Sequence, residues 1–213
     1  MTQARVHVRP ARAGEAARIA PLLYGVNPEL HDRFAGGRER ALQQIATAFE
    51  RPGHSGSADA VRVAEVDSQP VGVIGLYPVW EGAARARADV RLALRTGPRL
   101  RRPLLLAFVY RMQRAVPDAP LEALYVDALG TAPEYRRQGV ARALLATAEQ
   151  EARQFGLIRV GLETEVSNTA ARNLYESCGY LPSAQGRRVR GLPRFLSYVR
   201  EMGATRPATR QSP

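Results

Sequence analysis

The sequence predicts one α/β domain in which helices flank a sheet. With 213 residues, 45% of them hydrophobic, the chain is long enough to bury one well-developed core. Segments rich in β-branched residues alternate along it with segments whose apolar residues recur at helical spacing, as is typical of α/β proteins. The turn Asp67-Ser68-Gln69-Pro70 separates two strand-like segments, which predicts at least one antiparallel pair. We therefore expect a single globular unit.

The first 80 residues are expected to supply three strands and two helices. Pro28 and the pair Gly36-Gly37 indicate a loop between the two helices. The expected elements are a short strand at 6–10, a helix at 15–23, a loop at 27–37, a helix at 42–49, a loop at 51–58, and strands at 60–66 and 71–79.

Residues 81–120 are expected to form a longer helical connection between the third and fourth strands, although Gly97 and Pro103 interrupt its pattern. The domain should span 1–201, and a flexible tail should follow at 202–213, where Thr, Pro, Arg and Ser dominate. The pattern between these segments predicts a strand at 121–131, a helix at 140–155, a strand at 158–164, a helix at 168–178 with Ser167 as N-cap, and a strand at 195–200.

Composition limits the cellular setting and the cofactors. No stretch is apolar enough to span a membrane and the N-terminus lacks a secretory signal, so we expect a cytoplasmic protein without a membrane partner. Cys178 is the only cysteine and no His/Cys cluster has metal-ligand spacing, so neither a disulfide nor a metal is expected. Cys178 should pack in the core, and the scattered histidines should be surface or loop residues: His7, His31 and His54.

The net charge of +11 comes from arginine alone. Such a surface can attract nucleic acid, an anionic membrane or a polyanionic ligand. No nucleic-acid recognition motif accompanies the arginines, so nucleic acid is not favoured as a partner. The almost wholly apolar segment 104–112 could form core, line an acceptor pocket or make a dimer contact. A homodimer is therefore compatible with the sequence.

The most informative segment is the strand-to-helix connection from Thr131 to Arg142. The first N–H groups of a helix have no internal partner and carry the positive end of the helix dipole, so they can bind an anion. Small residues let a pyrophosphate approach these groups, and neighbouring arginines add charge. An ordinary connection with a surface arginine pair is the alternative. The residues expected to bind the cofactor here are Arg136, Arg137, Gln138, Gly139, Val140 and Ala141.

This segment resembles the phosphate-binding signature of the GNAT (GCN5-related) N-acetyltransferase superfamily, which is Arg or Gln, two residues, Gly, one residue, then Gly or Ala. Arg136, Gly139 and Ala141 match it, and residues 121–180 share the family's order of elements. The resemblance implies the GNAT fold: a central mixed, mostly antiparallel twisted sheet of about six or seven strands with splayed fourth and fifth strands. It also implies acetyl-CoA as cosubstrate, with the backbone of Leu129 and Thr131 bonding the pantetheine arm.

A second segment, 168–180, resembles the pattern with which the superfamily completes its cofactor site. Asn168, Ala171 and Tyr175 are spaced i, i+3 and i+7, so they lie along one helix face. The resemblance implies that Asn168 and Ala171 lie at the cofactor arm and that Tyr175 lies beside its sulfur. There Tyr175 would act as general acid towards the departing thiolate. A core tyrosine that packs the helix against the sheet is the alternative.

Asp127 is the candidate general base. Two-residue alternation puts it on the same strand face as Leu129 and Thr131, and the superfamily often draws its base from this part of the strand. A structural or solvent-facing aspartate is the alternative, since some members need no dedicated base. Other nearby candidates are Glu122, Tyr125, Glu163 and Glu165.

The expected function is acetyl transfer from acetyl-CoA to a primary amine, of a small molecule or of a protein N-terminus, by direct attack in a ternary complex. The resemblance implies that residues 24–40 and 81–120 shape the acceptor side. Two alternatives stay open: a module that binds acyl-CoA without turnover, and a basic nucleic-acid-binding protein whose retention on DNA would depend strongly on salt.

Overall fold

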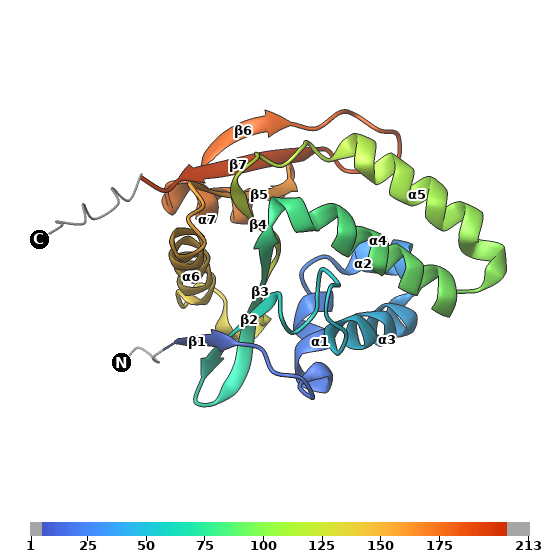
Figure 1. The fold of residues 1–213 in the computed structure, drawn as a ribbon, viewed down its shortest axis with the longest axis horizontal. Helices are drawn as coiled ribbons and strands as arrows, with labels where there is room; N and C mark the ends of the chain where they lie inside the picture. The colour runs from blue at the N-terminus through green and yellow to red at the C-terminus, as the bar shows by residue number, and fades with distance from the viewer. Residues whose placement is uncertain (1–5, 204–213) are drawn as a thin grey trace, which may run out of the picture.

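The computed structural model describes residues 6–203, and within them seven strands form one sheet (Figure 1). The strand order is β1-β2-β3-β4-β5-β7-β6. Only β4 and β5 pair in parallel, so the sheet is mixed and mostly antiparallel, which confirms the predicted fold class. The strands are β1 (His7–Pro10), β2 (Val61–Val66), β3 (Gln69–Pro78), β4 (Ala123–Thr131), β5 (Arg159–Glu165), β6 (Leu181–Gln185) and β7 (Phe195–Glu201).

Helices cover both faces of the sheet. In Figure 1, α6 and α7 lie to the left of the central strands, and α1 to α5 lie to the right. No helix within residues 6–203 is both long and apolar enough to cross a membrane. The helices are α1 (Ala16–Tyr24), α2 (Pro28–Ala35), α3 (Arg38–Phe49), α4 (Val79–Thr96), α5 (Arg102–Ala115), α6 (Val140–Gln154) and α7 (Thr169–Ser177), with short 3₁₀ turns η1 (Arg99–Arg101) and η2 (Pro133–Tyr135).

Each face of the sheet has its own core. The larger core packs α6 and α7 against β2 to β5 and β7 and includes Leu124, Leu144 and Leu162. The smaller core joins α1 and α3 to β2 and β3 on the other face through Ile19, Phe49, Val63 and Val73. The larger core packs against one face of β4 and β5, and Ala128 of β4 packs against the smaller core on the other face. The ends of β4 and β5 carry the candidate site.

The loop expected at 27–37 is instead the helix α2. Asn27 is its N-cap and accepts a hydrogen bond from the N–H of Leu30 at 3.1 Å, and Pro28 occupies the first helical position. Gly36 ends the helix in the left-handed conformation, with φ of 91°. The signals taken for a loop are therefore the start and stop signals of a short helix.

Other boundaries also differ from the sequence-based expectation. β6 had not been expected, because its five residues are all exposed and show no alternation of apolar and polar side chains. The N-cap of α7 is Asn168 rather than Ser167, since the Asn168 side chain accepts from the N–H of Ala171. Of the expected tail, 204–213 lie outside the described residues, whereas Met202 is buried and its N–H donates to the carbonyl of Ile158.

Candidate functional site

The centre of the site is a fork between β4 and β5. The parallel pairing of these strands runs only from Ala123↔Arg159 to Val126↔Leu162. Beyond that point β4 continues along β3 as far as Thr131, while β5 continues along β7 as far as Glu165. The facing edges of 127–131 and 163–165 therefore do not pair with each other, and backbone N–H and C=O groups of β4 are left available to a ligand.

Asp127 occupies a β-bulge at the start of this fork. On β3, Leu76 pairs with Val126 and Gly75 with Ala128, so Asp127 is an extra residue without a partner. The bulge interrupts two-residue alternation. Leu129 packs against the core under α6, while the Asp127 carboxylate accepts a hydrogen bond of 2.7 Å from the hydroxyl of Tyr77. The expectation that Asp127 shares a strand face with Leu129 is therefore wrong.

Two carboxylates, each bonded to a tyrosine, meet at the fork. Tyr77 on β3 donates to Asp127, and Tyr125 on β4 donates to Glu163 on β5. The two tyrosine rings lie 5.7 Å apart between centroids. Tyr77 was not expected at the site. Its one sequence signal is its place at the end of the strand that precedes the long helical connection.

Both carboxyl groups hold their protons more tightly than usual. The Asp127 side chain is reached by solvent, yet the protein around it displaces enough water to raise its pKa to about 6, although the Tyr77 hydrogen bond favours the charged form. Burial raises the pKa of Glu163 to about 7, with the charge of Asp127 contributing and the Tyr125 hydrogen bond opposing the rise. Because the charge of Asp127 adds to the rise at Glu163, Asp127 is the first of the two to lose its proton as the pH rises, and both groups titrate near neutral pH.

Tyr175 approaches the same fork from α7. Its ring is buried in the larger core against Tyr198, at 5.6 Å between centroids, and against Tyr180, at 6.3 Å. Burial, followed by the negative charge of Glu163, raises the pKa of its hydroxyl. The phenol is therefore a neutral donor at physiological pH and lies within electrostatic range of Glu163.

The strand-to-helix turn has the conformation of an anion site. Arg137 and Gly139 both have positive φ, of 60° and 85°, a pattern that turns successive N–H groups towards one side. The first hydrogen bond of α6 runs from the N–H of Ala143 to the carbonyl of Gly139, and no side chain caps the helix. The N–H groups of 140–142 are thus free for an anion, and a Cβ at Gly139 would meet nothing within 4 Å.

The remaining predicted cofactor residues surround this turn and the fork. Arg136 and Arg137 are exposed beside the turn, and Gln138 folds back to donate to the carbonyl of Glu134 at 2.8 Å. The Asn168 oxygen caps α7, which leaves its amide nitrogen for a ligand, and Ala171 packs against the larger core. Sequence reasoning had assigned no role to Arg142, which joins α6 to α7 by donating to the carbonyl and hydroxyl of Ser177.

The model of the Acetyltransferase (GNAT) family matches residues 27–180, well over half of the chain. The chain therefore belongs to the GNAT acetyltransferase family. The match covers α2 through α7, including the turn at the start of α6 and the fork between β4 and β5.

Proteins similar to this chain include N-acetyltransferases. The [ribosomal protein bS18]-alanine N-acetyltransferase of Escherichia coli (strain K12) is 37% identical over 84 residues, covering 35% of this chain and 53% of that protein. The uncharacterized N-acetyltransferase YycN of Bacillus subtilis (strain 168) is 33% identical over 66 residues, or 31% of this chain and 42% of that protein. The chain thus spans about half the length of the curated relatives it matches.

Solved structures share the fold at low sequence identity. An N-acetyltransferase from Staphylococcus aureus Mu50 superimposes with a TM-score of 0.70 at 19% identity, covering 91% of this chain and 99% of that one. The ribosomal-protein-S18-alanine N-acetyltransferase from Escherichia coli does so with a TM-score of 0.55 at 13% identity, covering 93% of this chain and 94% of that one.

Proposed function

We propose that this protein transfers the acetyl group of acetyl-CoA to a primary amine, which attacks directly within a ternary complex. The observation that carries the proposal is the fork between β4 and β5. At the fork the charge of Asp127 acts on Glu163, and Glu163 lies within electrostatic range of Tyr175, so groups that can accept a proton and a group that can donate one come together where the strands separate.

The cofactor would lie along α6, β4 and α7. Its pyrophosphate would bind the free N–H groups at the start of α6, beside the exposed Arg136 and Arg137. The positive end of the helix dipole and the two guanidinium groups both attract an anion. Its pantetheine arm would bond the open backbone edge of β4 at Leu129 and Thr131. The Asn168 amide nitrogen and the small side chain of Ala171 would border the same arm. Bound acetyl-CoA supplies the activated thioester carbonyl.

Residues of the chain would accept and donate the protons that the reaction moves. An amine attacks only when neutral, so the ammonium proton must leave first, and the Asp127–Glu163 pair accepts it because its pKa values lie near neutral pH. As the carbon–sulfur bond breaks, the departing thiolate would take a proton from Tyr175, and the proton that the nitrogen loses on becoming an amide would restore the phenol. Burial keeps that phenol protonated until this step, since its raised pKa disfavours the phenolate.

The acceptor is a primary amine of a small molecule or of a protein N-terminus. The two carboxyl groups at the fork suit a positively charged ammonium, although the chain as a whole carries a net charge of +11. The protein N-terminus is included because one relative is named as an alanine N-acetyltransferase of ribosomal protein bS18.

Purified protein mixed with isotope-labelled acetyl-CoA is expected to release free CoA and to form an acetylated amine. The acceptors are polyamines, amino-acid amides, peptides with free N-termini and a total cell extract. Thiol titration measures the CoA, and mass spectrometry identifies the product. Binding of acetyl-CoA without any labelled product in the extract would contradict catalysis and favour the non-catalytic module. The Tyr175→Phe variant is the control for uncatalysed transfer.

A further inference from the structure

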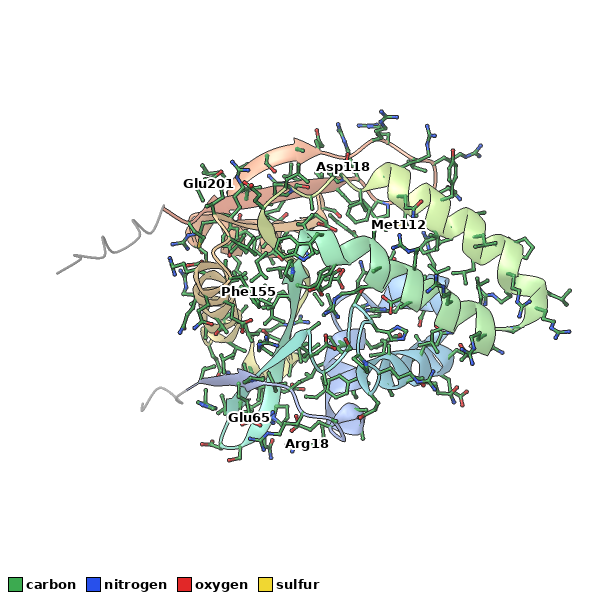
Figure 2. The ribbon with its side chains drawn as sticks, in the orientation of Figure 1. Arg18, Glu65, Met112, Asp118, Phe155 and Glu201 are labelled. Atoms are coloured by element: carbon green, nitrogen blue, oxygen red, sulfur yellow. The ribbon has the colours of Figure 1, made fainter. Side chains whose placement is uncertain are left out.

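Arg85, on the helix α4 that follows β3 directly, is buried beside the candidate site. Only 8% of its surface is exposed, and its guanidinium bonds to the loop 54–59 and to another residue of α4. Figure 2 shows the side chains around α4. The contacts are the carbonyl of His54 at 2.7 Å, the hydroxyl of Ser57 at 3.2 Å, the carboxylate of Asp59 at 2.8 Å and that of Glu81 at 2.7 and 2.9 Å. These bonds fix the guanidinium in one place.

Arg85 also lies over the ring of Tyr77. Its Cζ atom is 5.1 Å from the ring centroid, which is a cation–π distance. The edge of the same ring lies 3.5 Å from the point where a Cβ of Gly82 would stand, so α4 packs closely on Tyr77. The Tyr77 hydroxyl in turn donates to Asp127. A continuous set of contacts therefore runs from α4 through Tyr77 to the bulge of β4.

Further charges lie behind Tyr77. His54 lies in the loop before β2, in agreement with the expectation of a surface or loop residue, and it is buried there with its Nδ1 atom 2.7 Å from a carboxylate oxygen of Asp89 on α4. The positive charge of Arg85 lowers the pKa of Asp127 and the negative charge of Asp89 raises it, both to a smaller extent than burial and the Tyr77 hydrogen bond. The titratable or charged groups that face Asp127 are Tyr77 on β3, Tyr125 on β4, Glu163 on β5, and Arg85 and Asp89 on α4.

We propose that α4 positions the Asp127 carboxylate through Tyr77, with Arg85 as the positioning residue that holds the Tyr77 ring. This inference rests on the proposed function, because Asp127 belongs to the proton-accepting pair. Arg85 touches no reacting atom. It holds the Tyr77 ring so that the hydroxyl points at Asp127, and its charge favours the ionised carboxylate. The helical connection between β3 and β4 is thereby part of the active centre.

Two variants test the proposal. Tyr77→Phe removes the one hydroxyl that bonds Asp127, and Arg85→Met removes the charge while keeping an unbranched apolar chain. Each is expected to raise the pKa of Asp127, and Tyr77→Phe should raise it more than Arg85→Met, because the Tyr77 hydrogen bond lowers this pKa more than the charge of Arg85 does. NMR titration of the labelled Asp127 carboxyl carbon measures both shifts. For Tyr77→Phe the acid limb of the pH profile of kcat/KM should move up by about one unit, which is about a tenfold loss at acid pH and little change at alkaline pH.

Arg62→Met is the matched control. Arg62 is a half-buried arginine that binds Glu151 of α6 through two hydrogen bonds, of 2.6 and 2.8 Å, away from the fork. The Arg62→Met variant should lower the stability without changing the pKa of Asp127 or the pH profile of kcat/KM. If Tyr77→Phe folds and its Asp127 has the same pKa as in the wild type, the proposal is overturned, even if Arg85→Met does not fold. If the wild type transfers no acetyl group, the proposed function fails, while the NMR titration still decides whether α4 controls Asp127.

Discussion

Tyr175→Phe is expected to lower kcat for acetyl transfer by roughly 10²- to 10⁴-fold, the usual contribution of a positioned acid or base. The variant loses only the hydroxyl, which would protonate the departing thiolate, and keeps the ring packed against Tyr198 and Tyr180. The dissociation constant for acetyl-CoA and the melting temperature should therefore change little. Steady-state kinetics, calorimetric titration and thermal unfolding measure the three quantities.

Tyr180→Phe is the matched control for this substitution. Tyr180 belongs to the same aromatic cluster, and its hydroxyl is buried without a hydrogen-bond partner among the described residues. Removing that hydroxyl should leave kcat unchanged and should not destabilise the fold. Equal kcat values for Tyr175→Phe and the wild type would show that Tyr175 is a core tyrosine and that another group protonates the thiolate.

Glu163→Gln and Asp127→Asn are each expected to lower kcat/KM by roughly 10²-fold or more, because either change removes a member of the proton-accepting pair. In the wild type kcat/KM should fall as the pH drops below about 7, since the raised pKa values mean that the pair is protonated on the acid side. The measurement is a pH profile of kcat/KM between pH 5 and 9 for all three proteins. Glu122→Gln, an exposed carboxylate at the start of β4, is the control.

The raised pKa of Glu163 should also make the stability of the folded chain depend on pH. The pKa of Glu163 is higher in the folded chain than in the unfolded chain, so the unfolded state loses its proton first as the pH rises. The stabilising effect of the protonated group is fully present at acid pH and is lost as the pH rises to about 7. Between pH 5 and 8 the melting temperature of the wild type should therefore fall relative to that of Glu163→Gln. A flat pH profile together with no such fall would contradict a proton-accepting role for Glu163.

The features predictable from sequence are those encoded by neighbouring residues. The turn from Arg136 to Ala141 could be singled out because the features that would let a helix start bind an anion lie on consecutive residues. The order of strands and helices across 121–180 could be predicted from neighbouring residues too, and the structure confirms it. The helix α2 could have been predicted in the same way, because Asn27, Pro28 and Gly36 are local cap signals that had been interpreted as a loop.

The contacts that were missed depend on which strands pair and in what register. Asp127 could be named from its strand, but its bulge arises from the pairing of β3 with β4, which the sequence of either strand does not reveal. Tyr77 reaches the site only because β3 lies beside β4, and the burial of His54 requires α4 to cover its loop. The site residues themselves stay predictions until their variants are measured.

The role of the turn before α6 is tested most directly by isothermal titration of acetyl-CoA into the wild type and two double variants. Arg136→Glu with Gly139→Glu puts negative charge where the pyrophosphate would lie. Arg153→Glu with Gly156→Glu makes the same changes at the other end of α6, where Gly156 is also left-handed, with φ of 68°, and has open space around it. We expect the wild type and the second variant to bind acetyl-CoA and the first to lose binding. Equal binding by both variants, or no binding by the folded wild type, would contradict acetyl-CoA-dependent transfer at this site.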